Sequence, residues 1–174
     1  MILRVSQKLN SKIKIGALQT LPLDENPFAD WSANLFVSDR TQYILVSNTK
    51  SLYSTVIDGK GITNDNQIIQ QALSSIREFL ERDGYLSIYE RFIAPSTGTV
   101  HFAKSLNRSI TGSINEIVEL AKRALIEDGL PPHQVGIHLN DLLLSGIAVN
   151  PKDKYAKPRE SFQALVMTIG RGEK

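Results

Sequence analysis

The chain of 174 residues contains no cysteine. This absence excludes disulfides, thiolate nucleophiles and cysteine-ligated zinc or iron–sulfur sites, and it fits a reducing compartment. An excess of charge of one sign is also lacking, because 20 basic and 18 acidic residues give a formal net charge of +2. This balance neither favours nor excludes a partner that carries phosphate.

Long apolar runs are missing as well. The N-terminal segment MILRVSQKLNSK is interrupted at Arg4, and it lacks the apolar core of about 7–15 residues that a secretory signal needs. No segment approaches the run of about 20 apolar residues that spans a membrane. We therefore predict a soluble, cytoplasmic protein that has no membrane partner.

Hydrophobic residues make up 41% of the chain. A chain of this length can bury roughly two-thirds of its unfolded surface, which makes one domain the default. We predict a single compact α+β domain over residues 1–150. Residues 151–174 are expected to form a charged linker and a short C-terminal helix, opened by Pro158 and docked on the same domain.

Three runs rich in β-branched and aromatic residues predict strands at Trp31–Val37, Tyr43–Asn48 and Leu52–Ile57. The turns between them are too short for parallel pairing, which needs a crossover of about a dozen residues. These runs therefore predict an antiparallel meander. With further strands at Ile2–Val5 and Val100–Ala103, we expect an antiparallel sheet of four or five strands.

Two amphipathic helices follow the meander. Apolar residues at helical spacing over 68–80 predict the first helix, which ends at Gly84. The second is predicted to begin at Ser113, which forms a capping box with Glu116. We expect both helices to pack on one face of the sheet. Residues 135–145 fit a strand and a short helix equally well.

A polar loop, residues 104–113, precedes the second predicted helix. The free N–H groups and the dipole of a helix N-terminus favour a negative charge there, and basic side chains would add charged donors. The competing interpretation is a structural cap, in which Glu116 would repel an anion. The candidate ligand-binding residues of this loop are Lys104, Asn107, Arg108 and Ser109.

Four further candidates lie on or beside the meander, where they could line a polar groove: Trp31, Asn34, Arg40 and Asn48. Trp31, Arg40 and Asn48 each have a structural interpretation as well. A lone tryptophan is more often a core anchor than a stacking platform for a base, and Arg40 and Asn48 suit turns. A binding groove requires five residues to converge in space: Trp31, Arg40, Lys104, Asn107 and Arg108.

Catalytic motifs are absent from the sequence, which has neither a nucleophile elbow nor a phosphate-binding P-loop. The spacing of His133 and His138 is a weak zinc signal. His101 could act as a base with Glu90 or beside Arg108. We assign no catalytic residue, no metal and no cofactor, and leave open whether the protein is an enzyme.

Three segments carry a family resemblance: Asp30–Leu35 fits D-W-x-A-N/H-L, Arg40–Asn48 fits R-x-x-x-I/L-L-x-x-N, and Asn107–Asn115 fits N-R-S-x-x-G-S-x-N. On these motifs the chain resembles an uncharacterised bacterial family of about this length, over most of its residues. The resemblance implies no established activity, substrate or catalytic residue. Its motifs contain several of the polar candidates selected above.

These observations leave three hypotheses. The first is a non-catalytic binding module that holds an anionic ligand, a nucleic acid or a nucleotide, with loop 104–113. The second is a protein–protein interaction or regulatory domain, possible as a homodimer through 135–147 or the last helix. The third, a hydrolase or nuclease based on His101, has the least support because no nucleophile or carboxylate pair is indicated.

Overall fold

The computed structural model describes residues 1–145, 147 and 154–172. Its main sheet has five strands in the order β4–β3–β2–β1–β5. Their bounds are β1 Ile2–Val5, β2 Asp30–Ser38, β3 Thr41–Asn48, β4 Ser54–Asp58 and β5 His101–Ala103. The antiparallel meander of β2, β3 and β4 is confirmed.

The sheet is mixed, because β1 pairs in parallel with both β2 and β5. The prediction of a wholly antiparallel sheet is therefore wrong. Short turns require antiparallel pairing only within the meander. Between β1 and β2 the chain has residues 6–29 in which to return to the starting edge, and this length permits a parallel crossover.

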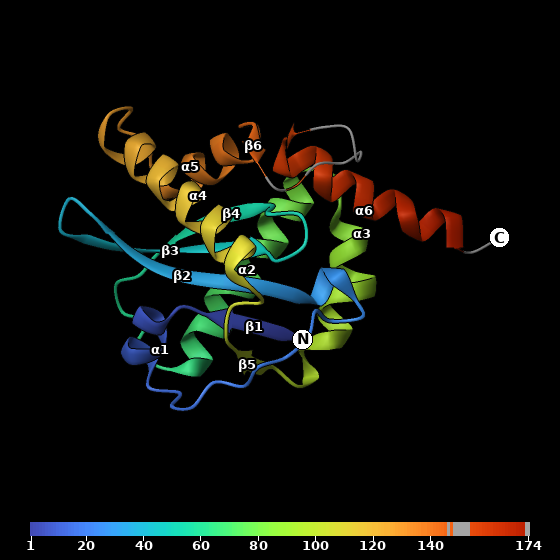
Figure 1. Ribbon diagram of the computed structural model, residues 1–174, viewed down its shortest axis with the longest axis horizontal. Helices are drawn as coiled ribbons and strands as arrows, with labels where there is room; N and C mark the ends of the chain where they lie inside the picture. Colours follow the sequence, from blue (N-terminus) through green and yellow to red (C-terminus); the bar gives the residue numbers. More distant parts are fainter. Residues whose placement is uncertain (146, 148–153, 173–174) are drawn as a thin grey trace.

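Six α-helices surround the sheet (Figure 1) in the described part of the chain. They are α1 Gln7–Ile13, α2 Asp65–Arg82, α3 Leu86–Ile88, α4 Arg108–Ile126, α5 Pro132–Leu139 and α6 Pro158–Gly172. Shorter elements are the 3₁₀ helices Pro27–Ala29 and Ala94–Gly98, the π-helical turn Tyr89–Ile93, and a second antiparallel pair, β6 Leu144–Ser145 and β7 Tyr155–Ala156.

The two main helices cover opposite faces of the sheet. Ile44 and Val46 of β3 belong to a core cluster with α1 and α2, whereas Leu45 belongs to a second cluster with α4 and α5. Figure 1 shows α4 crossing over the strands while α2 passes behind them. The expectation that both helices share one face is wrong, because the fully buried run 44–46 is apolar on both sides of β3.

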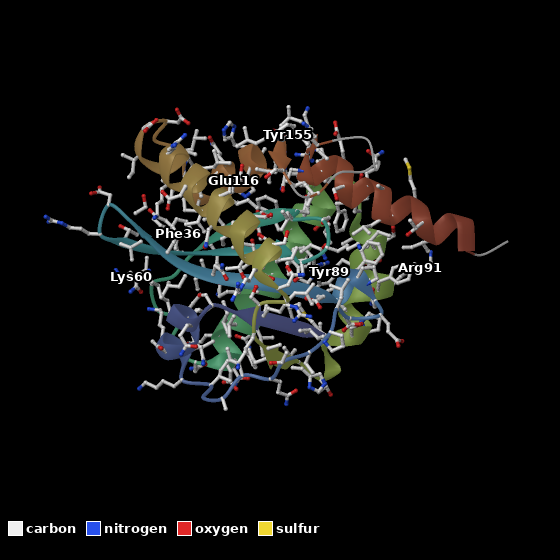
Figure 2. The ribbon with its side chains drawn as sticks, in the orientation of Figure 1. Phe36, Lys60, Tyr89, Arg91, Glu116 and Tyr155 are labelled. Atoms are coloured by element: carbon white, nitrogen blue, oxygen red, sulfur yellow. The ribbon has the colours of Figure 1, made fainter. Side chains whose placement is uncertain are left out.

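Helix α4 begins earlier than predicted. Its N-cap is Asn107, whose Oδ1 accepts a hydrogen bond from the Ile110 N–H at 2.9 Å. Asparagine caps a helix as well as serine, and Gly112 inside the helix costs only about 1 kcal/mol. Glu116 consequently lies well inside α4 (Figure 2) and not at its third position, which removes the predicted repulsion of an anion.

The chain ends agree with the sequence pattern where they are described. Ser6 caps α1 by accepting a hydrogen bond from the Leu9 N–H, and α6 starts at Pro158 as predicted. The ring of Phe162 is buried in the α2-side core cluster. The boundary at residue 150 and the first part of the predicted linker, residues 151–153, lie outside the described residues, so the boundary stays a prediction. The rest of the linker contains β7, Tyr155–Ala156. None of the helices among the described residues has both the length and the apolar character needed to cross a membrane.

Helix α5 settles the ambiguity at 135–145 in favour of a helix followed by the short strand β6. Gly136 lets α5 approach β4 closely. A Cβ atom at this position would lie 2.7 Å from Cζ of Phe79 and 3.2 Å from Cα of Thr55. We expect Gly136→Ala to lower the free energy of unfolding, measured by urea denaturation, by about 1–3 kcal/mol because the core is overpacked.

Gly112→Ala is the matched control. This glycine lies inside α4 and nothing would approach its added Cβ within 4 Å. The substitution should raise the free energy of unfolding by up to about 1 kcal/mol, because alanine favours the helix. Equal effects of the two substitutions would contradict the close approach of α5 to β4.

Candidate functional site

A crevice opens where β1 and β5 end. These neighbouring strands are parallel, so their carboxyl ends lie at one edge of the sheet. The chain leaves β1 into α1 on the α2 side, but leaves β5 into α4 on the opposite side. In open sheets with parallel strands, ligands bind at such a switch point because the diverging connections leave a crevice there.

The crevice contains a cavity of about 310 Å³. Hydroxyl and amide side chains line it together with basic groups and an apolar patch, and no carboxylate is among the described residues of its lining. This volume and this mixture are typical of a pocket for a small ligand. The lining residues are Arg4, Val5, Ser6, Gln7, Leu18, Ser32, Asn34, Lys104, Ser105, Thr111, Ile114 and Asn115.

Arg4 forms the rear of the crevice through a buried ion pair with Asp30. The two side chains are 1% and 0% exposed. Nε and Nη2 of Arg4 donate to the two carboxylate oxygens at 2.8 and 2.7 Å, a bidentate geometry. Nη1 donates to the Lys104 carbonyl at 3.2 Å, so Arg4 holds the end of β5 in place.

The remaining donors of Arg4 bind the loop between α1 and β2. Nη1 also donates to the Leu21 carbonyl at 3.0 Å, and Nη2 donates to the Pro22 carbonyl at 2.7 Å. The guanidinium is therefore committed within the protein and positions the crevice, with no donor left over for a ligand. Sequence reasoning missed this role, although a charge inside the apolar run of β1 was a usable signal.

The entrance is formed by the short connection from β5 to α4. The hydroxyls of Ser105 and Thr111 lie 2.7 Å apart, and Oγ1 of Thr111 is 3.0 Å from the Asn107 carbonyl, to which it can donate. The first N–H groups of a helix have no intrahelical partner. Arg108 and Ser109 begin α4, so their backbone N–H groups face outward from the helix start beside this connection.

The structure brings some of the predicted site residues together. Lys104 and Asn34 both line the cavity. Asn107, Arg108 and Ser109 do not line it. They form the cap and first turn of α4, between the lining residues Ser105 and Thr111 in the chain, and their side chains are exposed. The lining residues that the sequence analysis did not single out come mostly from the end of β1, the start of α1 and the first half of α4.

Two other predicted residues are committed to the core. Trp31 is fully buried, and its indole Nε1 donates to the Phe28 carbonyl at 2.7 Å. Asn48 is also fully buried; its Nδ2 donates to the Pro27 carbonyl at 2.8 Å and its Oδ1 accepts from the Ser51 N–H at 3.0 Å. Neither side chain is available to a ligand, as the structural interpretation of Trp31 anticipated.

Arg40 lies apart from the crevice. It occupies the two-residue hairpin between β2 and β3, where Asp39 and Arg40 have φ angles of 43° and 61°. Positive φ at both positions is the requirement of a type I′ turn. The predicted convergence of Trp31 and Arg40 with Lys104 is therefore not observed.

The histidines do not form the predicted acid–base arrangement. His101 is exposed on β5, and no hydrogen bond or ion pair joins it to Glu90 or Arg108 in the described part of the chain. Nδ1 of His133 lies 3.5 Å from Oε1 of Glu78. Within the described ranges, no group of three or more His, Asp or Glu side chains could hold a metal ion.

A separate polar cluster docks α6. Arg159 pairs with Asp83, and its Nε donates to Oδ1 of Asp141 at 2.8 Å, which lowers the pKa of that carboxyl group through the hydrogen bond. The Tyr53 hydroxyl donates to Asp83 at 2.5 Å. The pKa of Tyr53 is raised above its usual range, mainly because the hydroxyl is buried and secondly because the Asp83 carboxylate lies beside it. The cluster is structural because its groups bind one another.

The family described as a domain of unknown function (DUF6933) matches residues 2–161. The chain belongs to this family. The predicted resemblance to an uncharacterised family is thereby confirmed, and the DUF6933 match includes every residue that lines the crevice. No curated protein matches the chain. No solved structure matches it either.

Proposed function

We propose that this DUF6933 protein is a non-catalytic binding module for a small anionic ligand, one that carries phosphate or carboxylate, such as a nucleotide. The ligand binds in the crevice at the ends of β1 and β5. The observation that carries the proposal is the cavity itself, which combines Lys104 with neutral donors and has no carboxylate among its described lining residues.

The electrostatics of the crevice support an anion. The ammonium of Lys104 is the mobile charge at the entrance, because the guanidinium of Arg4 is already paired with Asp30. Helix α4 begins beside the cavity, and its dipole favours negative charge at that end. The Ser6 hydroxyl adds a neutral donor that suits phosphate or carboxylate oxygens, and the Ser105 hydroxyl adds a second one when Thr111 donates to it.

The size of the cavity supports a small ligand over a nucleic acid. About 310 Å³ lies at the lower end of the range of roughly 300–1,000 Å³ found for ligand pockets. Stacking on single-stranded bases needs an exposed aromatic side chain, whereas Trp31 is buried. The apolar patch of Val5, Leu18 and Ile114 suits the flat base of a nucleotide or another apolar group.

Calorimetric titration with inorganic phosphate, citrate and AMP tests the proposal. We expect at least one of these anions to bind, with an affinity that falls as salt rises. Lys104→Ala should weaken binding by about tenfold or more, because charge-assisted hydrogen bonds are worth about 1.5–3 kcal/mol.

Lys60→Ala is the control. Lys60 follows β4 (labelled in Figure 2), at the opposite edge of the sheet from β5, so its removal changes the net charge equally but leaves the crevice intact. Equal weakening by the two substitutions, or an absence of anion binding in the wild type, would contradict the proposal.

Homodimerisation through 135–147 or α6 stays a prediction, which the mass measured in solution would test.

A further inference from the structure

The second half of β2 has an open edge. Strand β1 ends at Val5, which pairs with Ala33, but β2 continues to Ser38. Residues 34–38 consequently pair with β3 alone within the described part of the chain. Among the described residues, no strand continues the position of β1 beside this half of β2, and this position is called the slot below.

The hydrogen bonds at the end of β1 identify which backbone groups face the slot. The Ser6 N–H donates to the Ala33 carbonyl at 3.0 Å, and the Leu35 N–H donates to Oγ of Ser6 at 3.4 Å. Groups that face one neighbour recur at every second residue of a strand. The Leu35 carbonyl and the Val37 N–H therefore point into the slot, away from β3.

A groove of about 470 Å³ follows this edge. Residues 34–37 form its floor, and Phe36 extends from β2 toward the α4 side (Figure 2). The walls come from the start of α1 and from the middle of α4. They are lined by Ser6, Gln7, Lys8, Asn115, Val118, Glu119 and Lys122.

Along residues 34–38, β2 carries no proline, bulge or charged side chain of its own. Proteins commonly block open edges with proline, a bulge or an inward-pointing charge, whereas residues 35–37 read Leu-Phe-Val and continue in regular register with β3. The side chain of Val37 is 53% exposed. An extended peptide can add to such an edge through main-chain hydrogen bonds.

The charge of the walls selects the partner. Lys8 and Lys122 line the groove, and Glu119 is held by Lys122 at 2.7 Å, which leaves the walls with a net positive charge. We propose that an extended acidic peptide segment of a partner protein adds to residues 34–38 as a strand in the empty slot. Its main chain pairs with Leu35 and Val37. Its carboxylates face Lys8 on the α1 side, and the alternate apolar side chains face Phe36 and Val118 on the α4 side.

This inference goes beyond the proposed anion site, because it depends on the backbone of β2 and not on Lys104. The groove and the crevice are contiguous, since both are lined by Ser6, Gln7, Asn34 and Asn115. Lys104→Ala keeps the two sites apart experimentally, because Lys104 lines the crevice and not the groove, whereas the glutamate carboxylates of an acidic peptide could enter either.

The test is fluorescence anisotropy with a labelled eight-residue peptide of alternating glutamate and valine, with its C-terminus amidated. We expect the wild type to bind it. Val37→Pro removes the N–H that faces the slot and leaves the bonds to β3, so binding should fall by about tenfold or more. Val37→Ala keeps the N–H and should bind within about twofold of the wild type.

Two further variants keep the outcome decisive. If circular dichroism shows that Val37→Pro does not fold, Val37→Glu takes its place, because an exposed carboxylate at the edge repels the acidic peptide without removing a backbone bond. Lys104→Ala should bind the peptide normally even where it has lost phosphate or AMP. The proposal is overturned if the wild type does not bind the peptide, if Val37→Pro binds it unchanged while folded, or if the matching lysine–valine peptide binds equally well.

Discussion

Replacement of Arg4 by methionine is expected to lower the free energy of unfolding by about 3–5 kcal/mol, the usual cost of removing one partner from a buried ion pair. The carboxylate of Asp30 is fully buried and would keep only the Asp24 N–H, 3.0 Å from Oδ2, among its present side-chain contacts. The carbonyls of Leu21 and Pro22 would also lose their donor. Trp31, the only tryptophan, adjoins Asp30 in the chain, so its fluorescence can follow unfolding in urea.

The double variant Arg4→Met with Asp30→Leu separates the charge from the packing. It leaves no ionised group buried, and replacing both partners of a buried pair is often close to neutral. We therefore expect the double variant to be more stable than Arg4→Met alone. A loss below about 1 kcal/mol for the single variant would mean that the pair does not hold the end of β5 as described.

Asn140→Ala is expected to lower the free energy of unfolding by about 2–5 kcal/mol. Oδ1 of this fully buried asparagine accepts from the Ser54 N–H at 2.7 Å, and its Nδ2 donates to the Ser54 carbonyl at 2.8 Å. The side chain thus pairs with the edge of β4 as a neighbouring strand would. Alanine would leave both backbone groups without a partner, and each buried unpaired group costs about 1–3 kcal/mol.

Asn66→Ala is the control for Asn140→Ala, and the free energies of unfolding of both variants are measured by chemical denaturation. Asn66 is exposed in the first turn of α2, so its loss should change the free energy of unfolding by less than about 0.5 kcal/mol. Asn140→Ala could lower the free energy of unfolding as little as Asn66→Ala only if water bound the Ser54 N–H and carbonyl in place of the carboxamide. The edge of β4 would then be open to solvent, which would contradict the burial of Asn140.

The sequence predicts the parts of the fold that local patterns determine. Short turns force the meander, and the apolar spacing over 68–80 determines α2. The parallel position of β1 depends on how residues 6–29 cross the sheet, which no local period encodes. The start of α4 was misplaced because Asn107 and Ser113 are both competent N-caps, and only the structure shows that the first one is used.

The site was predictable only in part, for the same reason. Lys104 and Asn34 were selected by residue type and position, and both line the crevice. Thr111 lies in the predicted binding loop 104–113 but was not singled out there. Ser6 was missed because it joins the lining only once β1 lies between β2 and β5. Arg40 is an exposed turn residue that lies apart from the crevice. Its position in a turn does not reveal from the sequence which other loops lie near it.

Amide chemical-shift mapping by NMR, with AMP and inorganic phosphate as separate titrants, tests the central claim that the crevice is a binding site. We expect the largest shifts, with saturation, on the backbone amides of Ser6, Lys104 and Thr111, and no shift of the hairpin amides at Asp39 and Arg40. Shifts confined to the hairpin or to α6, or no saturable shift with either titrant, would contradict it.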